Sequence, residues 1–406
     1  MSGPDLSTQS WLVSDSSKSV IAALEASGGP DCARYVGGCV RNAILGAKVD
    51  DIDIATQLLP KQVLAALKAA KIRAIPTGID HGTITAVVRG QPFEITTLRR
   101  DVETDGRRAV VAFTKDWAED AARRDFHLNA LYASGTGRIF DPTGQGLADA
   151  LAGRIAFVGQ AEQRIREDYL RILRFYRFWA WYGRGPVDAD GHAACKALAQ
   201  GVATLSAERV SKELLKLLSA PDPVPAVSAM INAGVLQVLL PHMDVTLFAD
   251  VAAISDDPLL RLASLLPRDR AVVTGEAKRL RLSNAQRDRW LAMVEPLPVV
   301  LDEPTSRAVI WKDGAQAFAD RSVLAQAAVP DAAPYSKLRQ MAEDWVPPPM
   351  PVGGRELAAM GIKAGPLTGQ ILKAFQASWI AADFPERGHD ERLAEVIRQI
   401  APAVTE

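Results

Sequence analysis

The segment GGCVRNAILGAKVDDIDIAT, residues 37–56, combines a glycine pair with two closely spaced aspartates. Gly37 and Gly38 follow the strand-like run ARYV and precede a short helical pattern. Asp51 and Asp53 alternate with isoleucines in a run that predicts a strand. Because residues two apart on a strand face the same side, both carboxylates should point together. The segment therefore predicts an acidic pair beside a strand-to-helix turn.

The acidic pair has the composition of a divalent-cation site. Two like charges side by side in a packed layer are costly unless a cation lies between them. Carboxylate oxygens favour Mg²⁺, which also accepts phosphate oxygens and water as ligands. A third acid, Glu94, alternates with Phe93 and Ile95 in another predicted strand, and three acids could hold two metals. The alternative is an exposed acidic pair without a metal.

The glycine pair is typical of an anion site. A turn of this kind lets backbone N–H groups and a helix N-terminus approach a phosphate chain. Arg41, one turn into the predicted helix, could reach the same anion. The spacing matches neither GxGxxG nor a P-loop, which argues against those two nucleotide sites. The alternative is a plain turn between a strand and a helix.

A base-reading site is predicted in EDYLRILRFYRF, residues 167–178, within one long helix that we expect to end at Gly183. Asp168 and Arg171 fall on one polar face of that helix, at about 100° per residue. Carboxylates only accept hydrogen bonds and guanidiniums only donate them. The pair therefore matches the Watson–Crick edges of cytosine and adenine and mismatches uracil and guanine. The alternative is a solvated helix face with an i,i+3 salt bridge.

Composition alone excludes little. Among 406 residues, 47 basic and 48 acidic side chains leave a net charge of -1, so any polyanion site must be a local patch. The three cysteines form no CxxC pair, which favours a reducing compartment. The first thirty residues lack the pattern of a secretory signal, and no apolar run reaches the ~18 residues of a membrane span. We therefore expect a cytoplasmic protein with no membrane segment.

Six segments in order resemble the bacterial- and eukaryotic-type tRNA nucleotidyltransferases, the CCA-adding enzymes, which share a family with bacterial poly(A) polymerases. They span about residues 35 to 180 and read GGCVRN, DIDIAT, FEITTLRRDVETDGRR, ARRDFHLNAL, FDPTGQGLADALAGRIAFVG and REDYLRILRFYRF. The polar segment 101–108, which the sequence predicts as a loop, resembles the family's flexible loop. Two departures from the family pattern are Asn42 in place of Asp and His127 in place of Thr.

The resemblance assigns roles to the motif residues. It implies that Asp51, Asp53 and Glu94 are catalytic and that Asp51 and Asp53 bind Mg²⁺. The nucleotide-binding residues that the resemblance implies are Gly37, Gly38, Arg41, Arg124, Asp125, Asn129, Asp168 and Arg171. The helix pattern adds Arg174 and Arg177, which could hold the triphosphate or stack on the base.

The implied fold is α+β. A nucleotidyltransferase head with a mixed β-sheet and helices, residues 1–145, should precede a helical neck for base recognition (146–218), a helical body (219–345) and a tRNA-binding tail (346–406).

The implied function is template-independent addition or repair of the 3′-terminal CCA of tRNA from CTP and ATP, with release of pyrophosphate. The protein should contact the acceptor–TΨC arm of tRNA, and no protein partner is implied. One alternative is a poly(A) polymerase or an enzyme that adds only C or only A. Another is a non-catalytic RNA-binding protein on the same fold.

Overall fold

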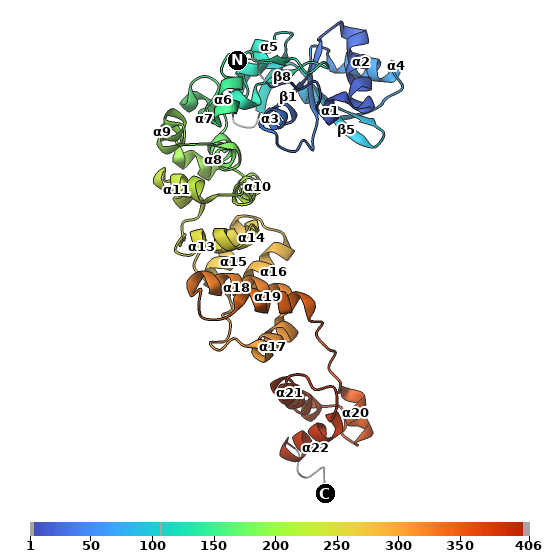
Figure 1. Ribbon diagram of the computed structural model, residues 1–406, viewed down its shortest axis with the longest axis vertical. Helices are drawn as coiled ribbons and strands as arrows, with labels where there is room; N and C mark the ends of the chain where they lie inside the picture. Colours follow the sequence, from blue (N-terminus) through green and yellow to red (C-terminus); the bar gives the residue numbers. More distant parts are fainter. Residues whose placement is uncertain (1–3, 106–107, 401–406) are drawn as a thin grey trace. The chain divides into compact units, whose positions relative to one another are not determined.

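A computed structural model describes residues 4–105 and 108–400, with only the backbone described for residues 80, 101–105 and 108–111. The chain folds as two compact units, Met1–Pro241 and His242–Glu406. The strands and the helices up to α12 belong to the first unit, and the helices from α13 onward belong to the second (Figure 1). The finer division into head, neck, body and tail stays a prediction.

A mixed sheet organises the first part of unit 1. Seven strands of the described chain follow the order β3-β4-β5-β2-β1-β8-β9, and all neighbours are antiparallel except β2 and β5. The bounds are Ala33–Val36 (β1), Asp53–Thr56 (β2), Arg73–Gly78 (β3), Thr83–Val88 (β4), Gln91–Thr97 (β5), Tyr132–Ala133 (β8) and Ile139–Phe140 (β9). A turn at Arg89 and Gly90 joins β4 to β5, with positive φ at both residues. The sheet and the helices after it confirm the predicted α+β class.

Helices α2 and α4 pack against each other and against the sheet. Helix α3 begins directly after Gly37 and ends at Gly46, whose left-handed conformation (φ 68°) is accessible to glycine at little cost. The helices that accompany the strands are Ser10–Val13 (α1), Asp15–Gly28 (α2), Gly38–Leu45 (α3), Pro60–Ala69 (α4), Trp117–Ala122 (α5) and Gly146–Ala152 (α6), with short 3₁₀ turns at Ile79–His81 (η1) and His127–Asn129 (η2).

A separate two-stranded hairpin replaces most of the predicted polar loop. Strand β6, Arg99–Asp105, pairs antiparallel with β7, Arg108–Phe113. The prediction of a loop from residue 101 is therefore wrong, and residues 106–107 lie outside the described residues. The physical reason is the pairing of β6 with β7. The run AVVAF lies opposite the segment, and the segment's alternating Val and Thr residues suit a paired strand.

The remaining helices of unit 1 contradict one sequence prediction. They are Ala161–Glu167 (α7), Leu170–Tyr182 (α8), Ala189–Ala197 (α9), Ala207–Leu218 (α10), Val224–Asn232 (α11) and Val235–Leu239 (α12), with a 3₁₀ turn at Ala199–Thr204 (η3). The prediction of one long helix is wrong, because the chain leaves helical geometry at Asp168, with φ -157° and ψ 107°. Its Oδ1 accepts a hydrogen bond from the backbone N–H of Leu170 at 3.1 Å. A short carboxylate competes well for such free N–H groups at a helix start.

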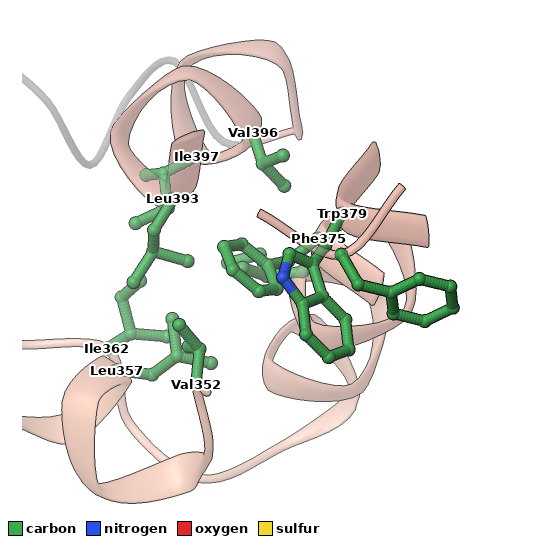
Figure 2. Packing of buried hydrophobic residues seen from close by; sticks show 10 residues of the cluster. Val352, Leu357, Ile362, Phe375, Trp379, Leu393, Val396 and Ile397 are labelled. Carbon is green, nitrogen blue, oxygen red and sulfur yellow. The ribbon is translucent and has the colours of Figure 1, made fainter. Parts of the chain in front are cut away.

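The described residues of unit 2 form helices and the segments that connect them, without a strand. Its helices are Phe248–Ile254 (α13), Pro258–Ala263 (α14), Arg270–Arg279 (α15), Asn284–Val294 (α16), Glu303–Asp313 (α17), Ala315–Ala328 (α18), Tyr335–Asp344 (α19), Gly354–Ala359 (α20), Pro366–Ala381 (α21) and His389–Ile400 (α22). The last three share an apolar core in which Leu357, Phe375, Trp379 and Leu393 are almost completely buried (Figure 2). Within the described residues no helix combines the length and the apolar character needed to cross a membrane.

Candidate active site

Two carboxylates lie side by side on parallel strands β2 and β5. Asp53, the first residue of β2, is paired in register with Glu94 of β5. Their strand neighbours Ile54 and Ile95 are fully buried, whereas Asp53 is half-buried and Glu94 is exposed. Asp51 is exposed and lies two residues before the strand, which is therefore shorter than predicted. The alternation places Asp53 and Glu94 on the polar side of the pleat.

Asp53 carries an unfavourable charge in the absence of a cation. Burial, followed by repulsion from Glu94 and Asp51, raises the pKa of Asp53 from 3.8 to about 6, although Arg124 and Arg41 oppose the change. Hard oxygen ligands under mutual repulsion fit the needs of Mg²⁺. In the described part of the chain, no group of three or more His, Cys, Asp and Glu side chains could hold a metal ion. Asp51 and Asp53 would need phosphate oxygens and water to complete the coordination of Mg²⁺, and the roles of Asp51, Asp53 and Glu94 stay predictions.

The glycine turn is lined by two guanidinium groups. Gly37 has φ 69°, and a Cβ built on it would lie 3.8 Å from Nη1 of Arg124. A Cβ built on Gly38 would lie 3.8 Å from Nη2 of Arg41. Arg124 is fixed by Asp120, whose Oδ2 accepts from Nη2 at 2.9 Å. The backbone of the turn therefore lies beside two positive charges.

Arg41 is buried and held by three acceptors. Its Nη1 donates to Oδ1 of Asn129 at 2.6 Å, and its Nη2 donates to the Tyr182 hydroxyl at 3.0 Å. Its Nε and Nη2 both donate to Oδ1 of Asn42, at 3.1 and 2.8 Å. Asn42, the departure from the family pattern, also donates from Nδ2 to the carbonyl of Lys48 at 2.7 Å. Burial lowers the pKa of Arg41, and the three acceptors fix its direction.

A hydrogen-bonded path joins the head residues to α8. Asn129 donates from Nδ2 to Oδ1 of Asp125 at 3.0 Å, and Arg174 donates from Nε to Oδ2 of Asp125 at 2.8 Å. Burial opposes ionisation of Asp125, but Arg174 together with the hydrogen bonds from Asn129 and the Phe126 N–H outweighs it and holds the pKa at about 2. The path from Arg41 through Asn129 and Asp125 to Arg174 connects the glycine turn to α8.

Asp168 and Arg171 lie on either side of the break between α7 and α8, so the prediction that they share one helix face is wrong. Oδ2 of Asp168 accepts from Nη2 of Arg209 at 2.6 Å. Arg171 donates from Nη1 to Glu167 at 2.5 Å and to the carbonyl of Arg164 at 2.7 Å. Asp168 and Arg171 therefore do not form the i,i+3 surface salt bridge that was the alternative interpretation. Each side chain is fixed by a partner of its own.

The break between α7 and α8 lies against the head. Nη2 of Arg164 donates to the carbonyl oxygens of Arg123 and Arg124, the second at 3.1 Å. Nη2 of Arg171 lies 3.4 Å from the Arg123 carbonyl. Because Arg124 lines the glycine turn, these contacts bring the predicted base-reading residues next to the predicted phosphate-binding residues.

Sequence reasoning missed several residues that hold the site together. Glu213 of α10 accepts from Nε of Arg177 at 2.6 Å. Phe178 is buried, and the guanidinium carbons of Arg41, Arg174 and Arg177 lie 5.1, 5.3 and 4.3 Å from its ring centroid. Other missed partners, described above, are Asp120, Glu167, Tyr182 and Arg209. The i,i+4 spacing of Arg209 and Glu213 in ERVSKELLKLL was the available signal.

His127 belongs to a different part of unit 1. Its Nδ1 lies 2.7 Å from Oδ2 of Asp149, whose other oxygen accepts from Nε of Arg154 at 2.7 Å. His127 also lines a cavity of about 640 Å³ that contains none of the other predicted site residues. The second departure from the family pattern therefore lies outside the candidate site.

Two family models and several named relatives are similar to this chain. Residues 33–156 match the family described as Poly A polymerase head domain, and residues 187–247 match the one described as probable RNA and SrmB-binding site of polymerase A. The Mus musculus protein named CCA tRNA nucleotidyltransferase 1, mitochondrial, is 34% identical over 364 residues, which are 85% of this chain and 82% of the mouse protein. A Streptococcus pyogenes CCA-adding enzyme is 39% identical over 201 residues, 49% of this chain and 48% of that protein.

Solved structures agree on the fold. The Bacillus stearothermophilus CCA-adding enzyme in complex with CTP has a TM-score of 0.77 at 24% identity, covering 96% of this chain and 98% of that one. The Thermotoga maritima CCA-adding enzyme complexed with tRNA has a TM-score of 0.68 at 19% identity, covering 94% of both chains. Identity of 34% sustained over 82% of the mouse protein decides the relationship: the chain belongs to the tRNA nucleotidyltransferase family of CCA-adding enzymes.

Proposed function

We propose that the protein adds or repairs the 3′-terminal CCA of tRNA from CTP and ATP and releases pyrophosphate. The observation that carries the proposal is the hydrogen-bonded framework of unit 1. It links the glycine turn to α8 through Arg41, Asn129, Asp125 and Arg174, and Arg41 and Arg124 act electrostatically on Asp53. We infer that the metal ligands, the phosphate donors and the base readers belong to one site.

Different residues of the site have different proposed roles in the reaction. Asp51 and Asp53 would hold Mg²⁺, which supplies Lewis-acid charge to the phosphates when bound. Arg41 and Arg124 bind the triphosphate at the glycine turn, which orients the α-phosphate. The tRNA 3′-oxygen forms a bond to the α-phosphorus as the bond to the pyrophosphate oxygen breaks. Glu94, beside Asp53, keeps its proposed role as the third acid.

Base choice follows from hydrogen-bond chemistry. Asp168 accepts from the exocyclic amino group of cytosine or adenine, and Arg171 donates to the adjacent ring nitrogen. Uracil and guanine leave buried groups unpaired, at about 1–3 kcal/mol for each group. Two such mismatches give roughly a hundredfold or greater discrimination. The partners Arg209 and Glu167 hold both readers in place before the nucleotide arrives.

The helical remainder is proposed to bind the acceptor–TΨC arm of tRNA by shape and phosphate contacts. The proposed boundaries remain 1–145, 146–218, 219–345 and 346–406. The relative from mouse is named mitochondrial and others are bacterial, so the cytoplasmic location stays a prediction.

The rival functions make different products. The names of the relatives favour CCA addition over poly(A) synthesis or the addition of one kind of nucleotide. The test uses tRNA that ends at the discriminator base, incubated with CTP, with ATP and with both. We expect two C residues with CTP alone and CCA with both nucleotides. A long A tail or a single added nucleotide would support one of the rivals, and no product would support a non-catalytic RNA-binding protein.

A further inference from the structure

One hydrogen-bond partner of Arg41 comes from α8 and not from the sheet-bearing part of unit 1. Asn42 and Asn129 belong to the sheet-bearing part of unit 1, whereas Tyr182 is the last residue of α8. The Tyr182 hydroxyl accepts from Nη2 of Arg41 at 3.0 Å, across 141 positions of sequence. The bond therefore joins the glycine turn to the end of the helix that begins beside Asp168.

Both parts of the Tyr182 side chain contact Arg41. The guanidinium carbon lies 4.3 Å from the Tyr182 ring centroid, which is within cation–π range. The Phe178 ring, one turn earlier on α8, lies 5.7 Å from the Tyr182 ring and also contacts Arg41. The two rings support the guanidinium, and the hydroxyl adds the directional contact. Removing only the hydroxyl would therefore leave Arg41 in place but less well oriented.

We propose that Tyr182 is a positioning residue that aims Arg41 at the nucleotide phosphates and couples the triphosphate end of the site to α8. The inference rests on the proposed function, because it takes Arg41 as a phosphate donor. Arg41 is buried, so its direction depends on its acceptors and not on solvent. Loss of the hydroxyl should weaken the binding of CTP and ATP equally. It should leave base choice unchanged, because Asp168 and Arg171 have other partners.

The test compares Tyr182→Phe with Tyr176→Phe. Tyr176 lies on the same helix, and its hydroxyl bonds to Nδ1 of His192 at 3.0 Å, so the control loses a similar contact away from Arg41. We measure the Kd for CTP with Mg²⁺, the KM and kcat for addition to tRNA, and the melting temperature. Tyr182→Phe should raise Kd and KM about tenfold with little change in kcat, as expected for one hydrogen bond to a charged group. Tyr176→Phe should leave Kd and KM unchanged.

A double variant separates positioning from general damage. If Tyr182 acts through Arg41, Tyr182→Phe should have little further effect on the Kd when Arg41→Lys is already present. Additive effects, equal losses in the Tyr176 control, or an unchanged Kd in Tyr182→Phe would overturn the inference. A wild-type protein that binds CTP but adds nothing to tRNA would contradict the proposed function and leave the Kd comparison valid. A wild-type protein that does not bind CTP would overturn both.

Discussion

The substitution Asp53→Asn should stabilise the metal-free protein at neutral and alkaline pH. The pKa of Asp53 is raised from 3.8 to about 6 by burial and by its acidic neighbours. Because the pKa of Asp53 is raised in the folded state, its protonation adds to the folding stability. This contribution is complete below pH ~4 and is lost as the pH rises through ~6. At pH 8 the charged Asp53 therefore costs up to about 3 kcal/mol relative to a neutral isostere. Asparagine has nearly the same shape and no charge.

Differential scanning calorimetry at pH 8 in EDTA measures this difference. For a unit of about 240 residues, 3 kcal/mol corresponds to an increase in Tm of roughly 6–12 °C, which is an upper limit because neighbouring groups relax. The increase should disappear near pH 4, where Asp53 is protonated. Mg²⁺ should raise the Tm of the wild type and not that of the variant, because binding to the native state stabilises it.

Asp50→Asn is the matched control for this experiment. Asp50 is exposed, and its ion pair with Lys48 lies on the surface. Its replacement should change the Tm little at either pH. If Asp53→Asn were no more stable than wild type at pH 8 in EDTA, or if Mg²⁺ left the difference unchanged, the reasoning about the acidic pair would be refuted.

Four further predictions concern activity. Asp51→Ala should abolish nucleotide incorporation while the circular dichroism spectrum stays native, and appreciable Mg²⁺-dependent activity would reject it as a ligand. Shortening the 101–108 segment should leave tRNA ending in CC, because adenine needs a rearranged pocket, and equal losses of C and A in sequenced products would count against this role. Alanine at both Asp168 and Arg171 should relax selection against UTP and GTP in single-turnover assays, whereas an unchanged ratio of CTP to UTP use places base choice elsewhere. Asn42→Asp should keep kcat, since a carboxylate still accepts from Arg41. It should lower the free energy of unfolding by about 1 kcal/mol because the Lys48 carbonyl loses its donor, and unchanged stability would contradict this.

Local features of the site were predictable from sequence. Gly46 ends α3 because a left-handed residue is needed there, and Arg89 and Gly90 supply the positive φ of a hairpin turn. The alternation around Asp53 and Glu94 predicted buried neighbours, and both strands have them. These features depend on residues close in sequence, so pattern and turn chemistry are sufficient to find them.

The end of α7 was not predictable from periodicity. The apolar spacing runs through Asp168 without interruption, and only the structure shows that the chain leaves helical geometry there while the Asp168 carboxylate accepts from the Leu170 N–H. Phe175, which helical spacing places on the same side as Asp168 and Arg171, is fully buried and stacks on Phe157 with ring centroids 5.5 Å apart. Helix α8 packs against α10 and α11 as well as α7, so it has more than one buried side. A helical wheel cannot show a second packing partner that lies far along the chain.

Ion-pair partners were hidden for the same reason. Glu213 follows Arg177 by 36 positions and Arg209 follows Asp168 by 41, and many other acids and arginines were equally possible partners. The sequence predicted which residues carry the chemistry. It did not show which partners orient them, because that choice is made by the packing of α10 against α8.

The most direct test of the account is the sequence of the tRNA 3′ end after a reaction with all four nucleoside triphosphates at equal concentration. The substrate ends at the discriminator base, Mg²⁺ is present, and products are read by sequencing. The account predicts that C, C and A are added in that order and that addition then stops, with U and G rarely incorporated. Long A tails, frequent U or G, or addition that ends after one kind of nucleotide would contradict it.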